Sequence, residues 1–154
     1  MWQHVAMLTY SISESREFTS TDLVGLYTSV GWLTYASDPV SLLRALAQSS
    51  YVVSATDAAG QLIGLARVVS DDVSICFFQD ILVRPGHQRS GIGRALVERV
   101  LERYGHVRQK VLLTDAESGQ RAFYESLGFS EAHDFEPSPL RAFVRFGVQQ
   151  QQSQ

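Results

Sequence analysis

The chain has 154 residues, of which 45% are hydrophobic, and its 13 lysine and arginine residues are outnumbered by 16 aspartate and glutamate residues. This length predicts a single globular domain over residues 1–148 with one active site, followed by a polar tail at 149–154 that has nothing to bury. The net charge of -3 excludes the global basic field of a nucleic-acid-binding protein, so any anion site has to be local.

The first half of the chain predicts one strand, two helices and a hairpin. In chain order these elements cover Met7–Ile12, Asp22–Val30, Pro39–Ala47, Tyr51–Thr56 and Gln61–Ser70. Capping side chains are supplied before the first helix by the run Thr19–Asp22 and before the second by Asp38, where proline follows at the favoured first helical position. The last two runs are apolar and β-branched, and the residues Asp57 and Gly60 between them predict a turn.

The second half predicts strands and helices in alternation. They cover Val73–Val83, a helix from Ile92 that Gly105 stops, Gln109–Thr114, Glu117–Leu127 and Arg141–Val148. Apolar residues recur at helical spacing after Ile92, and the strands on either side of this helix should lie parallel with a right-handed crossover. The chain therefore contains a βαβ unit at its centre.

The loop that opens this helix has the character of an anion site. Gly91 and Gly93 let a ligand approach the backbone N–H groups of a helix N-terminus, which carries the positive end of the macrodipole. Positive charge is added nearby by Arg84, His87, Arg89 and Arg94. These features favour a pyrophosphate. The Gly-Lys-Ser/Thr of a P-loop is absent, and Leu96 stands where a dinucleotide fingerprint has its third glycine. A glycine-capped helix without a ligand stays open as the alternative.

Three segments together resemble the GNAT superfamily of N-acetyltransferases. Gln88-x-x-Gly91-x-Gly93 resembles the Q/R-x-x-G-x-G/A signature of that family. The strand Gln79–Val83 with Pro85 behind it resembles the family's fourth strand, and Arg121–Phe129 resembles its A-x-x-F-Y-x-x-x-G-F ending. The similarity spans roughly Leu62–Phe129. It implies an α/β fold with a mostly antiparallel mixed sheet, a parallel βαβ core and flanking helices.

The resemblance also implies a donor site for acetyl-CoA as co-substrate, with no metal and no covalent nucleophile. Its pyrophosphate would lie on the loop and its pantetheine along the strand before the loop. The implied cofactor-binding residues are Ile81, Leu82, Val83, Gln88, Arg89, Ser90, Gly91, Ile92, Gly93 and Arg94. An N–H of Leu82 or Val83 would stabilise the oxyanion, and Tyr124 would protonate the departing thiolate. Glu117 stands where many members of the family carry asparagine.

A base has to take a proton from the acceptor ammonium. Asp80 is the first candidate, because a carboxylate on so apolar a strand is costly to bury without a partner. The alternative is a structural carboxylate paired with an arginine such as Arg67, and His133 is the second candidate base. The implied acceptor pocket consists of aromatic residues, each of which could instead complete the core. They are Tyr27, Trp32, Tyr35, Phe78 and Phe135.

The sequence thus predicts an N-acetyltransferase in which an amine attacks acetyl-CoA directly in a ternary complex. The acceptor is a small amine or an amino group of a peptide or protein, and the aromatic residues suit an aromatic or alkyl amine. A non-catalytic acyl-CoA-binding or sensing module is the alternative. Sheet edges that relatives often cover make a homodimer a further expectation.

Cysteine usage and hydropathy predict where such an enzyme works. Cys76 is the single cysteine, which excludes an intrachain disulfide and a multi-cysteine zinc site and favours a reducing compartment. No basic segment followed by a long apolar stretch occurs at the N-terminus, and no apolar run reaches the roughly eighteen residues of a membrane span. We therefore expect a cytoplasmic protein whose partners include neither a membrane nor nucleic acid.

Overall fold

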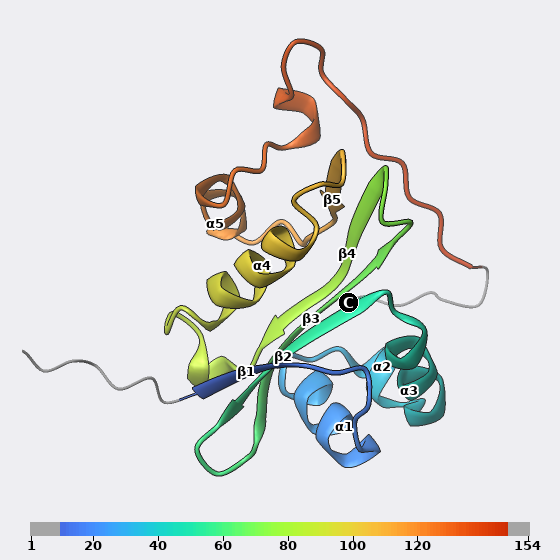
Figure 1. Ribbon diagram of the computed structural model, residues 1–154, viewed down its shortest axis with the longest axis vertical. Coiled ribbons are helices and arrows are strands. Elements are labelled where there is room, and N and C mark those ends of the chain that lie inside the picture. Colours follow the sequence, from blue (N-terminus) through green and yellow to red (C-terminus); the bar gives the residue numbers. More distant parts are fainter. Residues whose placement is uncertain (1–9, 148–154) are drawn as a thin grey trace, which may run out of the picture. The chain divides into compact units, whose positions relative to one another are not determined.

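A computed structural model describes residues 10–147 of the chain (Figure 1). These residues belong to two compact units, of which the first ends at Leu112 and the second begins at Leu113. The first unit holds the sheet and most of the helices. One domain over residues 1–148 stays a prediction, and the tail at 149–154 lies outside the described residues.

The sheet of the first unit has five strands in the order β1-β2-β3-β4-β5. Neighbouring strands are antiparallel except β4 and β5, which are parallel. The strands are β1 (Tyr10–Glu14), β2 (Tyr51–Asp57), β3 (Leu62–Ser70), β4 (Ile75–Val83) and β5 (Gln109–Leu112). The mixed sheet with its parallel βαβ core is the predicted fold class. The predicted first strand began at Met7, but Met7–Thr9 lie outside the described residues.

Among the described residues the first unit has four α-helices, three of which the sequence predicts. They are α1 (Ser20–Ser29), α2 (Leu33–Ala36), α3 (Pro39–Gln48) and α4 (Ile92–Arg103). The Thr19 hydroxyl accepts a hydrogen bond from the N–H of Asp22, and an Asp38 carboxylate oxygen accepts one from the N–H of Ser41, as the capping side chains predicted. The four residues of α2 are too few to show a helical period, so the sequence did not predict this helix.

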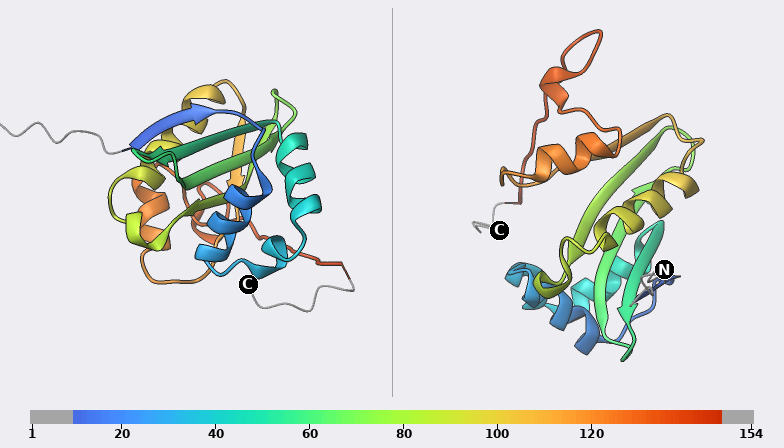
Figure 2. Two further views of the ribbon diagram at one scale, coloured as in Figure 1. Left: turned by 90° about the horizontal axis from the view of Figure 1, so that it is seen from below. Right: turned by 90° about the vertical axis from the view of Figure 1, so that its left-hand side faces the viewer.

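The helices cover the two faces of the sheet. Figures 1 and 2 show α4 on one face and α1 to α3 on the other. The core on the second face consists of Leu23, Leu26, Tyr27, Leu42, Leu46, Val52, Leu62, Leu65 and Leu82. On the opposite face the apolar side of α4 buries Ile92, Leu96, Val97 and Val100. Within residues 10–147, no helix combines the length and the apolar character needed to cross a bilayer.

The second unit contains α5 (Gln120–Ser126) and a short 3-10 turn (Ala132–Asp134). The predicted strand at Arg141–Val148 is wrong over residues 141–147, which form neither strand nor helix, while Val148 lies outside the described residues. Phe143 and Phe146 are 88% and 61% exposed. Residue types that favour extended backbone are not enough to form a strand, because a strand also needs a neighbour for its backbone hydrogen bonds.

Candidate functional site

β4 and β5 begin side by side and then separate. Their pairing ends at Phe78 opposite Leu112, the last residue of β5. β4 continues from Gln79 to Val83, and among the described residues no strand pairs with this stretch on the side of β5. Backbone N–H and C=O groups along an unpaired strand edge are available to an extended ligand. The open edge includes residues 81–83, where the sequence predicts the pantetheine.

A β-bulge lies where this open edge begins. Asp80 is opposite Arg67 and Phe78 is opposite Val68, so Gln79 has no opposite residue on β3. An extra residue of this kind bends its strand and increases the local twist. The bulge therefore gives a physical reason for the separation of β4 from β5.

The loop after β4 leads into the N-terminus of α4. Gly91 is the N-cap residue and has a φ of 85°, a conformation that favours glycine. Because Gly91 has no side chain, it does not cap the N–H groups of the first helical turn, which also lack acceptors within the helix. Residues 88–91 are exposed. These N–H groups and the positive end of the helix macrodipole form an accessible anion cradle.

The side chain of Gln88 fastens this loop to the end of β4. Its Nε2 donates a hydrogen bond to the carbonyl oxygen of Val83 at 3.1 Å. Within the loop, the hydroxyl of Ser90 donates to the carbonyl oxygen of His87. The side-chain amide of Gln88 thus has a structural role, because it holds the cradle beside the open strand edge.

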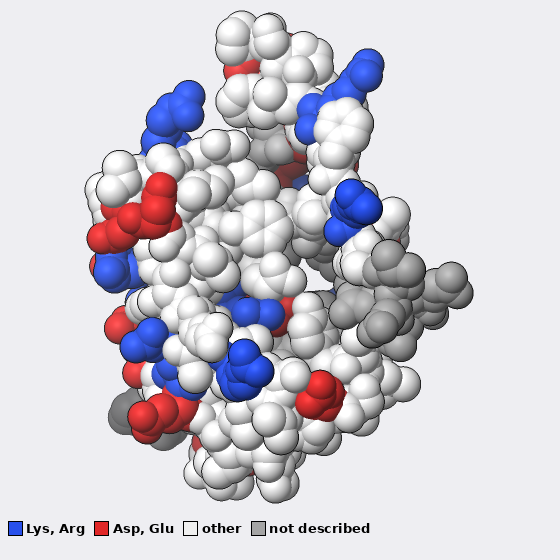
Figure 3. Space-filling model, turned by 90° about the vertical axis from the view of Figure 1, so that its right-hand side faces the viewer, with Lys and Arg blue, Asp and Glu red and all other residues white. Residues whose placement is uncertain are grey.

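The arginines near the loop are oriented differently. Arg84 donates from Nε to the carbonyl oxygen of Leu62 at 2.8 Å, and its Nη2 would lie 3.1 Å from a Cβ placed on Gly25 of α1. Arg84 therefore lies against α1. Arg94 pairs with Glu98, one turn further along α4, at 3.1 Å, and Arg89 is an exposed residue of the loop. On the face shown in Figure 3, the acidic and basic side chains of the described residues are interspersed and form no field of a single sign.

Asp80 lies in a buried hydrogen-bonded network. Its Oδ2 accepts a hydrogen bond from Nε of Arg67 at 2.5 Å and another from the hydroxyl of Tyr27 at 2.8 Å. Arg67 also donates to the hydroxyl of Ser49 at 3.3 Å. Arg67 and Asp80 are only 6% and 3% exposed. Because this carboxylate is buried and paired with Arg67, the geometry favours the alternative that the sequence left open, a structural role for Asp80.

Three of the predicted pocket residues form one aromatic cluster beside Asp80. The ring centroids of Tyr27, Trp32 and Tyr35 are 5.4 to 6.2 Å apart. Burial, together with the charge of Asp80, raises the pKa of Tyr27 well above its usual value, so its hydroxyl remains a donor. Trp32 and Tyr35 are partly exposed, so a ligand can reach their rings.

Gln79 joins this cluster and was not among the predicted site residues. Its Nε2 donates to the hydroxyl of Tyr35 at 3.3 Å. An exposed amide directly before a buried aspartate on an apolar strand is the signal that could have identified it. The other predicted pocket residues differ: Phe78 is 1% exposed and completes the core, and Phe135 belongs to the second unit, where it is 46% exposed.

Tyr124 lies near the end of α5 and is held by the residues that end the helix. The N–H of Phe129 donates to the carbonyl of Tyr124, and that of Gly128 donates to the carbonyl of Glu125, both at 3.0 Å. With the φ of 92° at Gly128, this is a Schellman motif. The Tyr124 ring packs edge-on against Phe123 and Phe129. Burial raises the pKa of Tyr124 to about 12, so the hydroxyl is protonated at neutral pH.

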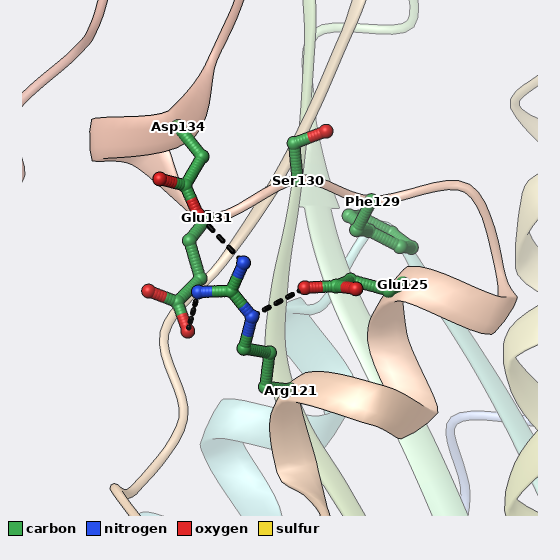
Figure 4. A pocket seen from close by; sticks show the side chains of 6 residues that line it. All are labelled: Arg121, Glu125, Phe129, Ser130, Glu131 and Asp134. Atoms are coloured by element: carbon green, nitrogen blue, oxygen red, sulfur yellow. Dashed lines mark hydrogen bonds and ion pairs between the residues drawn. The ribbon is translucent and has the colours of Figure 1, made fainter.

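The second unit also contains an acidic cluster around Arg121 (Figure 4), next to a hollow of about 300 Å³. Arg121 pairs with Glu125 at 2.5 Å, Glu131 at 3.4 Å and Asp134 at 2.7 Å. His133, the second candidate base, lies 3.3 Å from both Glu131 and Asp134. All five side chains are exposed, so this cluster has the character of a solvated ion-pair network.

Cys76 is buried, and its burial raises the pKa of the thiol to about 11. Because the thiolate is the reactive form, we expect the native chain to react with a disulfide reagent at pH 8 only as fast as it unfolds. Release of the coloured thiolate from that reagent, with and without urea, measures this rate. We expect Cys76→Ala to keep full activity. Rapid labelling of the folded chain together with loss of activity would show that Cys76 is a functional thiol.

Comparison with known proteins gives one consistent family. The model of the Acetyltransferase (GNAT) domain matches residues 47–131 of the chain. Histone acetyltransferase TAP1 of Glycine max is 32% identical over 119 residues, which cover 70% of this chain and 50% of that protein. The chain thus spans about half the length of this relative. The uncharacterized N-acetyltransferase ycf52 of Pyropia yezoensis is 27% identical over 126 residues, covering 80% and 71% of the two chains.

A solved structure shares both the fold and part of the sequence. A GNAT-family acetyltransferase from Streptococcus pneumoniae superposes with a TM-score of 0.73 and 29% sequence identity. The alignment covers 89% of this chain and 99% of that one. The match to the family model, residues 47–131, contains β2 to β5, the glycine loop and α4.

Proposed function

The chain belongs to the GNAT family of acetyltransferases, and on this premise we propose that it transfers an acetyl group from acetyl-CoA to a primary amine. The amine belongs to a small molecule or to a peptide or protein. The observation that carries the proposal is the open edge of β4 at residues 79–83, which the hydrogen bond from Gln88 to Val83 holds next to the anion cradle of α4. An extended thioester with a pyrophosphate at its far end matches this pair of features.

The donor would use mainly main-chain atoms. In the proposal, the pyrophosphate accepts hydrogen bonds from the N–H groups of residues 88–94, and the pantetheine pairs with Ile81–Val83. The N–H of Leu82 or Val83 then stabilises the oxyanion that forms when the amine attacks the thioester carbonyl. Acetyl-CoA supplies the activated acyl group, so this direct attack requires neither a metal nor an acyl-enzyme.

The acceptor would approach along the aromatic cluster of Tyr27, Trp32 and Tyr35. The partly exposed rings of Trp32 and Tyr35 suit an aromatic or alkyl amine. We propose that Arg67 and Asp80 hold the aromatic cluster in place through Tyr27. Water would take the proton of the incoming ammonium. Once the carbon–sulfur bond breaks, Tyr124 gives its proton to the CoA thiolate and regains one from solvent.

One observation favours a second function, that of an acyl-CoA-binding or sensing module. Asp80, the predicted base, is 3% exposed and accepts hydrogen bonds from the buried partners Arg67 and Tyr27, so it lies within a structural network and away from solvent. Such a module would bind acetyl-CoA without turning it over.

Release of CoA from acetyl-CoA in the presence of a panel of amines separates the two functions. The panel should contain arylalkylamines, alkyl diamines and lysine-containing peptides, and calorimetry should measure acetyl-CoA binding in parallel. Turnover that depends on one amine class supports the enzyme. Binding without turnover by any member supports the module, and absence of binding contradicts both.

A further inference from the structure

Gly64 of β3 lies against the first turns of α4. A Cβ placed on it would be 3.1 Å from Cγ2 of Ile92, 3.2 Å from Cδ1 of Leu96 and 3.4 Å from the carbonyl oxygen of Leu82. Carbon atoms in good contact are about 3.5–4.0 Å apart. The missing side chain is therefore what allows α4 to pack at this distance on the face of the sheet that it covers in Figure 2.

The backbone itself does not need a glycine at this position. Gly64 lies opposite Val83 on β4 and Ala55 on β2, and its φ is not in the left-handed region. The register of β2 and β3 shifts beside it, because Ile63 has no opposite residue on β2. Glycine in the interior of a strand often marks such a bulge or a close approach by another group, and at Gly64 the side chains of α4 do approach closely.

The three atoms around Gly64 belong to both halves of the proposed donor site. Ile92 is the first residue of α4 and follows Gly91 of the anion cradle directly, and Leu96 lies one turn later on the same helix. Leu82 lies on the open edge of β4. The spacing between the first turn of α4 and this strand edge is set at Gly64.

We propose that Gly64 is a positioning residue for acetyl-CoA: it fixes the distance between the pyrophosphate cradle and the pantetheine edge. This inference rests on the proposed function. Ile92 and Leu96 are 2% and 0% exposed, so neither side chain can move out into solvent to accommodate a methyl group. Instead the N-terminus of α4 has to shift by a few tenths of an ångström, and the N–H groups of the cradle shift with it.

Gly64→Ala in the full chain tests the proposal. We expect the Kd and KM for acetyl-CoA to rise about fivefold to tenfold, because small misplacements of binding groups have large effects. The kcat and the KM for the amine should stay within about twofold. Gly86→Ala is the matched control: it adds the same methyl group close to the loop, but nothing lies within 4 Å of it and its φ is not left-handed.

A second variant covers the case in which Gly64→Ala folds poorly. Ile92→Ala removes the contacting Cγ2 and makes room for the methyl group, so adding Gly64→Ala to Ile92→Ala should weaken acetyl-CoA binding by no more than about twofold relative to Ile92→Ala itself. Calorimetry on all four chains gives this comparison. Wild-type chain that does not bind acetyl-CoA would overturn the proposed function. Wild-type binding with equal affinities for Gly64→Ala and Gly86→Ala would overturn the role of Gly64 alone.

Discussion

Replacing Arg67 by methionine is expected to lower the free energy of unfolding by about 3–5 kcal/mol, because it leaves the carboxylate of Asp80 buried without its charged partner. Asp80 is 3% exposed and keeps only the hydrogen bond from Tyr27. The free energy of unfolding of a domain of this size is about 5–15 kcal/mol, so this one substitution would remove a large fraction of it. Urea unfolding followed by far-UV circular dichroism measures the difference.

The same substitution at an exposed pair provides the control. Arg99 lies 3.2 Å from Glu14, and both side chains are 41% or more exposed. Arg99→Met should therefore change stability by no more than about 1 kcal/mol. Arg67→Met combined with Asp80→Leu should recover most of the loss, because no unpaired charge is then buried. Equal effects of Arg67→Met and Arg99→Met would show that the buried pair has no special role.

Tyr124→Phe is expected to reduce kcat by roughly 10²–10⁴ while the KM for acetyl-CoA stays within about twofold, since it removes a proton donor but no ring contact. The phenylalanine ring can keep the edge-on contacts with Phe123 and Phe129. Because burial raises the pKa of Tyr124 to about 12, deprotonation of this group should not reduce the rate between pH 7 and 10. Steady-state kinetics across this pH range gives both readouts.

Tyr104→Phe is the matched control for this experiment. Tyr104 is a buried tyrosine, 2% exposed, whereas Tyr124 is half-buried, and Tyr104 lies at the C-terminal end of α4, away from the cradle at the N-terminus. Its hydroxyl has no part in the proposed transfer, so its loss should leave kcat unchanged. If Tyr124→Phe behaves as Tyr104→Phe does, the thiolate is protonated by another group and Tyr124 is a core residue.

Signals that are local in the chain predicted most of the fold. Thr19 and Asp38 marked the starts of two helices, and Gly91 marked the third. Residues 141–147 show where such signals fail. Their aromatic and β-branched residues favour a strand, but pairing depends on a neighbouring strand that the local sequence does not contain.

The candidate site divides in the same way. The cradle and the strand before it are consecutive in sequence, so motif and geometry agreed there. The pairing of Asp80 with Arg67 depends on the register of β3 and β4, including the bulge at Gln79, and the sequence could present it only as an alternative. The grouping of Tyr27 with Tyr35 depends on α2, which was too short to predict. The role of Gly64 depends on the packing distance between α4 and β3, which is a tertiary property that no local sequence pattern contains.

The unpaired end of β4 has a consequence for how this protein can change. If the donor is held by backbone groups at residues 81–83, the side chains there are free to vary as long as the strand keeps its course. Acceptor specificity, in contrast, would depend on the side chains of α1 and α2. Mutations could then change which amine the enzyme accepts without altering its acetyl-CoA site. Directed evolution of acceptor specificity should therefore concentrate on residues 27–35.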